Sequence, residues 1–219
     1  MWYTVKNKRN KGKKVEILFE DKSVIVCIKP RGILSQSDIK GGENMIDNLS
    51  AITKSEIYPL HRLDKEVGGV MVYAKTKKAA AILSRDIAEH KFSKEYIVLI
   101  HSKPKESSGE MRDLLFKDSR KNKSFVVRRQ RKGVKEALLE YSLLESNGEF
   151  SICLVKLHTG RTHQIRVQFA SRKMALAGDK KYGAKDDYKT IGLWSYRIIF
   201  KHPETNEILT FSADADFSL

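Results

Sequence analysis

Residues 61–75 read HRLDKEVGGVMVYAK, a charged run that changes within a few positions into an apolar one. The carboxylate of Asp64 stands between basic neighbours, directly before residues 69–74, whose apolar and β-branched content predicts a buried strand. The guanidinium of Arg62 favours the ionised carboxylate, which can act as a covalent nucleophile or accept a proton. An exposed ion pair is the alternative interpretation. Asp64 is therefore the first candidate for a catalytic residue.

Strands are predicted on both sides of this segment. Residues 15–20 and 23–28 form a hairpin pattern around Asp21-Lys22, and Lys29-Pro30 ends its second strand. Residues 137–145 and 149–157 form another around Asn147-Gly148. Further strands are predicted over residues 92–100, 193–200 and 208–211. Helices are predicted over residues 45–52 and 77–90, the second with Ala79, Ala80, Leu83 and Ile87 on one face. A third helix is predicted after Thr162, its expected cap, with Ile165 and Phe169 facing inward and Arg166 on a neighbouring face. We expect one folding unit.

The charge balance points to a polyanionic partner. Lys plus Arg number 42 against 27 Asp plus Glu, which gives a net charge of +15 in a chain of 219 residues. Such a surplus concentrates polyanions around a protein, so nucleic acid is the first partner to consider. No apolar run approaches the roughly 18 to 20 residues of a spanning helix, so we expect no membrane partner.

The beginning of the chain and its two cysteines favour a cytoplasmic protein. Residues 1–14 carry six basic side chains and lack the apolar core of a secretory signal, so we expect a loose basic N-terminal arm before a domain over residues 15–219. Cys27 and Cys153 form no Cys-x-x-Cys pair, and each stands in an apolar setting. We expect two reduced, buried thiols.

Residues 117–135 hold nine basic side chains and one acid. One interpretation is a solvated hairpin at a sheet edge, since basic residues often protect such edges. The other is a patch that follows the phosphates of a nucleic acid.

Several signatures of other chemistry are absent from the sequence. It contains no Gly-x-Gly-x-x-Gly, P-loop, Gly-x-Ser-x-Gly or His-Glu-x-x-His segment. His158 and His163 are five residues apart and lack the i, i+4 spacing of two ligands on one helix face. We expect no metal and no nucleotide cofactor.

Three ordered motifs resemble those of the RluA-type pseudouridine synthases. They are His61-Arg62-Leu63-Asp64 with its following Gly-bearing strand, Lys94-x-Tyr96, and residues 159–166, TGRTHQIR. Residues 21–32, the segment GDKKYG at 178–183 and His202-Pro203 are similar to other landmarks of that family. The resemblance covers about residues 15–215.

The resemblance implies an isomerase that breaks the N-glycosidic bond of a selected uridine in ribosomal or transfer RNA, turns the uracil and rejoins it through carbon. It implies a catalytic domain without a cofactor, which we expect to be a monomer. The implied fold is α+β: a mixed, mainly antiparallel, bent β-sheet with flanking helices and a central active-site cleft. The strand-rich pattern supports this fold.

The resemblance also implies roles for single residues. Asp64 matches the catalytic aspartate, whose attack is either on the ribose anomeric carbon or on the uracil ring. Arg62 matches the residue that helps to fill the gap left by a flipped base, Tyr96 an aromatic that can stack on the uracil, and Arg166 the arginine that pairs with the catalytic carboxylate. RNA-binding roles are expected for His61, Lys94, Arg161 and Gln164 in the motifs, and for Arg128, Arg129 and Arg131 in the basic segment.

The chain departs from the family pattern at three places. Val67-Gly68-Gly69 stands where many members have Thr-Ser-Gly, so hydroxyl hydrogen bonds are missing there. Gln168 stands where a histidine is common, and only the short basic arm precedes the first strand, where an RNA-binding domain is commonly attached. We expect the catalytic domain itself, through residues 117–135, to choose the target.

Two other functions remain to be weighed. A non-catalytic RNA-binding module or RNA-folding chaperone could share the fold, but the presence of Asp64, Tyr96 and Arg166 argues against it. An acid-dependent nuclease is disfavoured because the sequence lacks carboxylate clusters for a metal.

Overall fold

The computed structural model describes residues 2–5, 15–38 and 41–219. It divides into two compact units, residues 1–94 with 194–216 and residues 95–193 with 217–219. This division is finer than the single domain over residues 15–219 that the sequence predicts, and that domain boundary stays a prediction.

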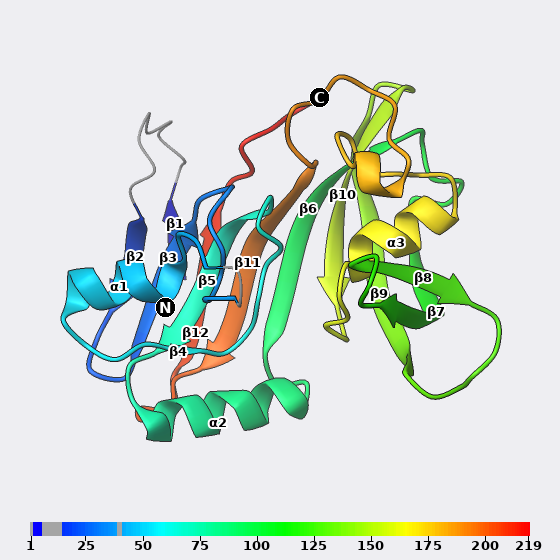
Figure 1. Ribbon diagram of the computed structural model, residues 1–219. Coiled ribbons are helices and arrows are strands. Elements are labelled where there is room, and N and C mark those ends of the chain that lie inside the picture. Colours follow the sequence, from blue (N-terminus) through cyan, green and yellow to red (C-terminus); the bar gives the residue numbers. More distant parts are fainter. Residues whose placement is uncertain (1, 6–14, 39–40) are drawn as a thin grey trace. The chain divides into compact units, whose positions relative to one another are not determined.

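The first unit is a mixed sheet with two helices (Figure 1). Its strands run in the order β2-β3-β5-β11, with β12 beside β11, β1 beside β12 and β4 beside β5. The β5–β11 and β1–β12 pairs are parallel, whereas the other pairs are antiparallel. The bounds are β1 Trp2–Val5, β2 Glu16–Glu20, β3 Val24–Lys29, β4 Tyr58–Pro59, β5 Gly68–Ala74, β11 Leu193–Lys201, β12 Ile208–Ala213, α1 Met45–Thr53 and α2 Lys77–Ala88.

Local signals account for these elements. Strands β3 and β5 are buried over their whole length, as expected of central strands. The side chain of Asn44 caps α1 and that of Thr76 caps α2. The predicted apolar face of α2 is only partly right, because Ala79 and Leu83 are buried whereas Ala80 and Ile87 are half-buried.

The expected loose arm is wrong for residues 2–5. They form β1, which pairs with Thr210–Ala213 of β12, so sheet pairing fixes this backbone. Residues 6–14 of the predicted arm lie outside the described residues.

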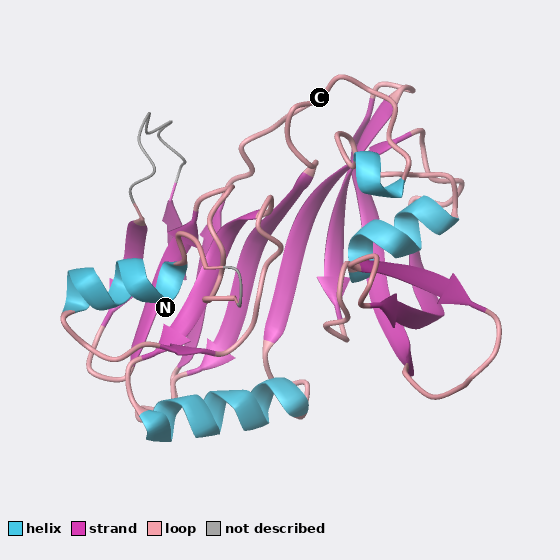
Figure 2. Cartoon of the chain, in the orientation of Figure 1, coloured by secondary structure: helices cyan, strands magenta, loops and turns pink. Residues whose placement is uncertain are grey.

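The second unit consists of a sheet with the strand order β6-β10-β9-β7-β8 and a packed helix (Figure 2). The Asn147-Gly148 hairpin is confirmed, and the Asn147 side chain accepts hydrogen bonds from the amides of Glu149 and Phe150. Strand β8 is at the edge, so residues 117–135 do contain an edge hairpin. The bounds are β6 Ser93–His101, β7 Ser108–Asp118, β8 Lys123–Val127, β9 Val134–Ser146, β10 Phe150–Leu157, α3 Gln164–Ser171 and η1 Lys180–Tyr182.

The mainly antiparallel α+β fold is thus confirmed, and the central cleft stays a prediction. Cys27 and Cys153 are free and buried, as expected. Burial raises the pKa of both thiols, that of Cys153 to about 12, so neither is a reactive thiolate. Within the described ranges, none of the helices has the length and apolar character needed to cross a bilayer.

Candidate active site

Asp64 lies in the loop between β4 and β5 of the first unit. Its side chain is half-buried, that of Arg62 is exposed, and Leu63 between them is buried. The hydroxyl of Ser35 donates to the carbonyl of Leu63 and accepts from its amide, both at 2.9 Å. The amide of Val67 donates to the carbonyl of Asp64 at 3.0 Å, which closes a turn. The backbone is therefore fixed on both sides of the carboxylate.

The buried ammonium of Lys29 also binds the loop that carries Asp64. It donates to the carbonyls of Pro30, Lys65 and Val67 at 2.9, 3.1 and 2.8 Å. Burial, and after it the charge of Arg31, lower the pKa of Lys29 to about 8, although the charges of Glu66 and Asp64 oppose the shift. The sequence pattern indicates Lys29 only as the end of a strand. A lysine closing an otherwise apolar strand was the available signal.

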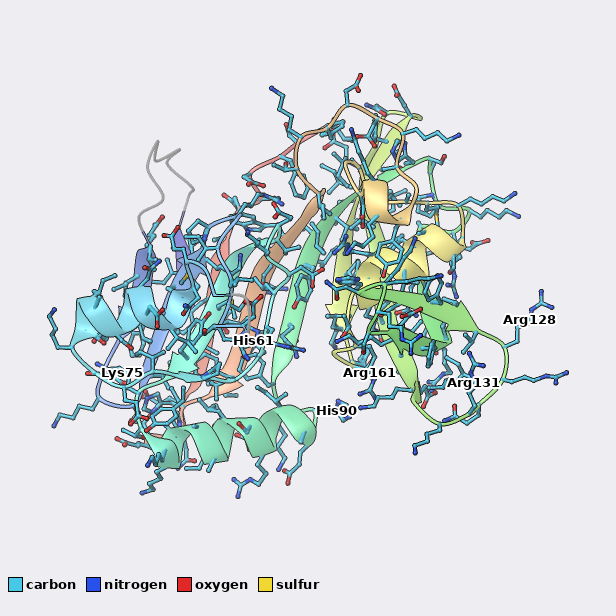
Figure 3. The ribbon with its side chains drawn as sticks, in the orientation of Figure 1. His61, Lys75, His90, Arg128, Arg131 and Arg161 are labelled. Carbon is cyan, nitrogen blue, oxygen red and sulfur yellow. The ribbon has the colours of Figure 1, made fainter. Side chains whose placement is uncertain are left out.

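His61, at the start of the motif, packs inside the first unit (Figure 3). Its Nε2 accepts a hydrogen bond from the amide of Val72 at 3.4 Å, and its ring lies 5.8 Å from that of Phe92. Burial, aided by the charge of Lys94, lowers the pKa of His61 to about 3. This neutral imidazole supports the core, and a direct RNA contact stays a prediction.

The low pKa of His61 predicts a loss of stability in acid. The folded-state pKa is below the usual 6.5, so as the pH falls from 6.5 towards 3 the unfolded chain gains a proton that the folded chain does not, and unfolding becomes easier. We expect the fall in Tm between pH 7 and pH 5 to be smaller for His61→Gln than for the parent. His90→Asn, at an exposed site, is the control and should keep the parental fall. Equal falls for parent and His61→Gln would show that another group carries the acid sensitivity.

Arg166, in α3 of the second unit, forms a buried bidentate ion pair with Asp179. Its Nε lies 2.7 Å from Oδ2 and its Nη2 lies 2.8 Å from Oδ1. The two side chains are 6% and 1% exposed, and the guanidinium carbon lies 5.2 Å from the ring centre of Tyr182. Arg166 follows Ile165 in α3 and so lies on a neighbouring face of the helix, as expected, and this face is buried as well because residues 164–169 are all buried. Its pairing with Asp64, which belongs to the other unit, stays a prediction.

Gln164 builds the turn that precedes α3. Its Oε1 accepts from the Thr159 hydroxyl and the Arg161 amide at 2.8 and 3.0 Å, and its Nε2 donates to the carbonyl of Leu138 at 3.1 Å. The residue is 3% exposed. This occupied amide supports a positioning role, and a direct RNA contact by Gln164 stays a prediction.

The expected Thr162 cap is wrong. The residue before α3 is His163, which adopts φ 54° and makes no side-chain cap hydrogen bond. The carbonyl of Thr162 instead accepts from the hydroxyl of Ser124 at 2.6 Å, and Tyr182 Oη accepts from the Ser124 amide at 2.9 Å. His163 Nδ1 lies 2.9 Å from the same Oη. The β7–β8 hairpin is thereby joined to the turn that precedes α3.

Gln168, which replaces a common histidine, is fully buried. Its Nε2 donates to the carbonyl of Met111 at 2.9 Å and to Asp113 Oδ2 at 2.7 Å. Asp113 also pairs with Arg172 at 2.9 Å. This departure therefore serves the packing of α3 on β7.

The other predicted site residues fall into three settings. Tyr96 is buried in β6, and Lys94, half-buried at the start of that strand, has its pKa lowered by burial. Arg161 donates from Nε to the carbonyl of Glu136 at 2.7 Å. Arg128, Arg129 and Arg131 are exposed residues of the β8–β9 loop, where Figure 3 labels Arg128 and Arg131. The guanidinium carbon of Arg131 lies 4.9 Å from the ring centre of Phe116.

Among the described residues, no group of three or more His, Cys, Asp or Glu side chains could hold a metal ion. The first unit places the half-buried carboxylate of Asp64 on an anchored loop.

Comparisons with known proteins show what the chain is similar to. The sequence profile of the family described as RNA pseudouridylate synthase matches residues 23–171. Ribosomal large subunit pseudouridine synthase D of Borreliella burgdorferi is 32% identical over 198 residues, which are 84% of this chain and 60% of that protein. An uncharacterized RNA pseudouridine synthase of Aquifex aeolicus is 35% identical over 221 residues, covering 91% of this chain and 69% of that protein. The chain thus spans about two thirds of the length of these curated relatives.

Solved structures show the same fold at lower identity. Human RNA Pseudouridylate Synthase Domain Containing 1 superposes with a TM-score of 0.79 at 20% identity, covering 97% of this chain and 88% of that one. Human RNA Pseudouridylate Synthase Domain Containing 4 gives 0.76 at 23% identity, with 91% and 88% covered.

Proposed function

Because the chain belongs to the RNA pseudouridylate synthase family, we propose that it isomerises selected uridines in structured RNA to pseudouridine, with Asp64 as the catalytic nucleophile. The reaction breaks the bond between uracil N1 and the ribose, turns the base and joins C5 to the same ribose carbon. N1 gains a proton and C5 loses one, so the product is an isomer and no redox cofactor is needed. The observation that carries the proposal is the half-buried Asp64 carboxylate on a loop fixed by Ser35 and Lys29.

The target uridine must leave its stack before a carboxylate can reach it. Base flipping costs a few kcal/mol, which side chains that fill the gap and stack on the base can offset. The exposed Arg62, two residues before Asp64, is proposed to fill the gap, and Tyr96 to stack on the uracil.

Ribosomal RNA is the substrate we propose to test first, with transfer RNA second. The relative from Borreliella burgdorferi carries a ribosomal large subunit in its name, which supports this order. A cytoplasmic monomer is the form proposed to act on either RNA.

The function is tested by mapping pseudouridine in total RNA from cells with and without the gene. We expect at least one site to disappear and to return when the parental gene, but not Asp64→Asn, is restored. If every site persists in the deleted strain, the proposed function is wrong.

The β8–β9 loop is proposed to bind RNA phosphates through Arg128, Arg129 and Arg131. Changing all three to Ala should weaken RNA binding, and the slope of log K against log salt should fall by up to roughly 0.7 to 0.9 for each phosphate that the variant no longer neutralises. Fluorescence anisotropy at several salt concentrations measures both.

A matched control separates this loop from net charge. The exposed α2 residues Lys77, Lys78 and Arg85 carry the same three charges, and their change to Ala should leave the slope close to parental. If both triple variants lose affinity and slope equally, only net charge matters and the loop has no special role.

A further inference from the structure

Arg31, in the turn after β3, connects the Asp64 loop to the segment that follows β12. Its Nη1 donates to the carbonyl of Glu66 at 2.8 Å. Its Nε and Nη2 donate to the two carboxylate oxygens of Asp216 at 2.6 and 2.7 Å. The Arg31 side chain is 13% exposed and that of Asp216 is 35% exposed. A bidentate pair fixes both the position and the plane of a guanidinium, so Asp216 orients Arg31 towards the carbonyl of Glu66.

Trp194 supports the same group from β11. The guanidinium carbon of Arg31 lies 5.6 Å from the indole centre, within the range of a cation–π contact. The indole Nε1 donates to the carbonyl of Ala213 at 2.9 Å. The ring is therefore held at one end by the strand that leads to Asp216.

Gly68, at the exit of the loop, leaves room for this indole. Trp194 is its register partner in the parallel β5–β11 pair. A Cβ atom on Gly68 would lie 2.5 Å from Cζ3 of Trp194, a distance that requires the ring to move. The departure from Thr-Ser-Gly at residues 67–69 thus has a physical reason, because a serine at position 68 and this indole exclude each other.

We propose that Asp216, Arg31 and Trp194 are positioning residues that hold the carboxyl-terminal half of the Asp64 loop in its reactive geometry; the proposal rests on the proposed function. Ser35 anchors the loop immediately before Asp64, and Arg31 anchors it two residues after. Small misplacements of a reacting group can slow a reaction by up to about 100-fold, so an anchor this close to the nucleophile acts on the rate. None of the three has to touch the RNA.

Asp216→Asn tests the proposal with little change in shape. It removes the charge that aims Arg31, and we expect the single-turnover rate to fall about tenfold while the RNA Kd and Tm stay near parental. Hydrogen exchange of residues 62–68 should become faster, because the turn is less firmly held. Asp214→Asn, at an exposed residue two positions earlier, makes the same charge change and should leave rate and exchange unchanged.

A double variant tests whether Asp216 acts on the loop through Arg31. If Asp216 acts through Arg31, the double change Arg31→Ala and Asp216→Asn should slow the reaction no more than Arg31→Ala alone. Additive losses would overturn this route.

If Asp216→Asn and Asp214→Asn show the same rate and the same exchange pattern, the positioning role of Asp216 is wrong. The role is also wrong if a lower RNA affinity or a lower Tm of Asp216→Asn accounts for the whole loss of rate. If the parent forms no product, the proposed function fails, and exchange alone decides whether Asp216 orders the loop.

Discussion

Asp64→Asn is expected to abolish pseudouridine formation, with a rate at least about 10⁴-fold below that of the parent, the scale seen when a nucleophile is removed. The amide has nearly the shape of the carboxylate but neither its charge nor its nucleophilicity. Because Asp64 is half-buried and the loop is held through backbone groups, we expect the fold and the RNA affinity to change little. Release of tritium from RNA labelled at C5 of uridine measures the reaction, since C5 loses its hydrogen.

This variant also separates the enzyme from an RNA-folding chaperone that shares the fold. A chaperone would act on RNA equally well with or without the Asp64 carboxylate, whereas an isomerase would bind RNA and form no product. Asp214→Asn is the control for the change of charge and should keep parental activity. Product formed by Asp64→Asn at the parental rate would refute the nucleophile assigned here.

Arg166→Ala is expected to lower the free energy of unfolding by about 3 to 5 kcal/mol, because it leaves the Asp179 carboxylate buried without its partner. Urea unfolding followed by circular dichroism measures the loss. Arg172→Ala, which removes a partly exposed ion pair with Asp113 from the end of the same helix, is the comparison and should lose no more than about 1 kcal/mol. Similar losses in the two variants would contradict the importance given to burial of the pair.

Activity gives a second measure of Arg166. Arg166→Lys keeps the charge but not the two parallel hydrogen bonds, so we expect a folded protein with a reduced rate. If Arg166→Ala folds and turns over at the parental rate, the residue has no part in catalysis. If stability falls while the rate of the folded fraction stays parental, Arg166 serves the structure alone.

The sequence by itself determined the elements whose signals are local. The Asn147-Gly148 turn and the apolar run at residues 69–74 each predict their own structure, because the residues that fix the backbone are neighbours in the chain. The order of the motifs around Asp64, Tyr96 and Arg166 was enough to indicate the family, which the comparisons then showed.

Only the tertiary structure decided the partners of these residues. Asp216 meets Arg31 across 185 positions and Lys29 reaches Val67 across 38, and the side-chain patterns at either end do not encode such pairings. The pairing of residues 2–5 with β12 depends equally on the topology of the sheet. Short-range periodicity reports which face of an element is buried, whereas the group that a buried charge meets depends on where the chain returns. The sequence therefore predicts Asp64 as a candidate catalytic residue, but it does not predict the contacts that hold its loop, because these come from distant parts of the chain.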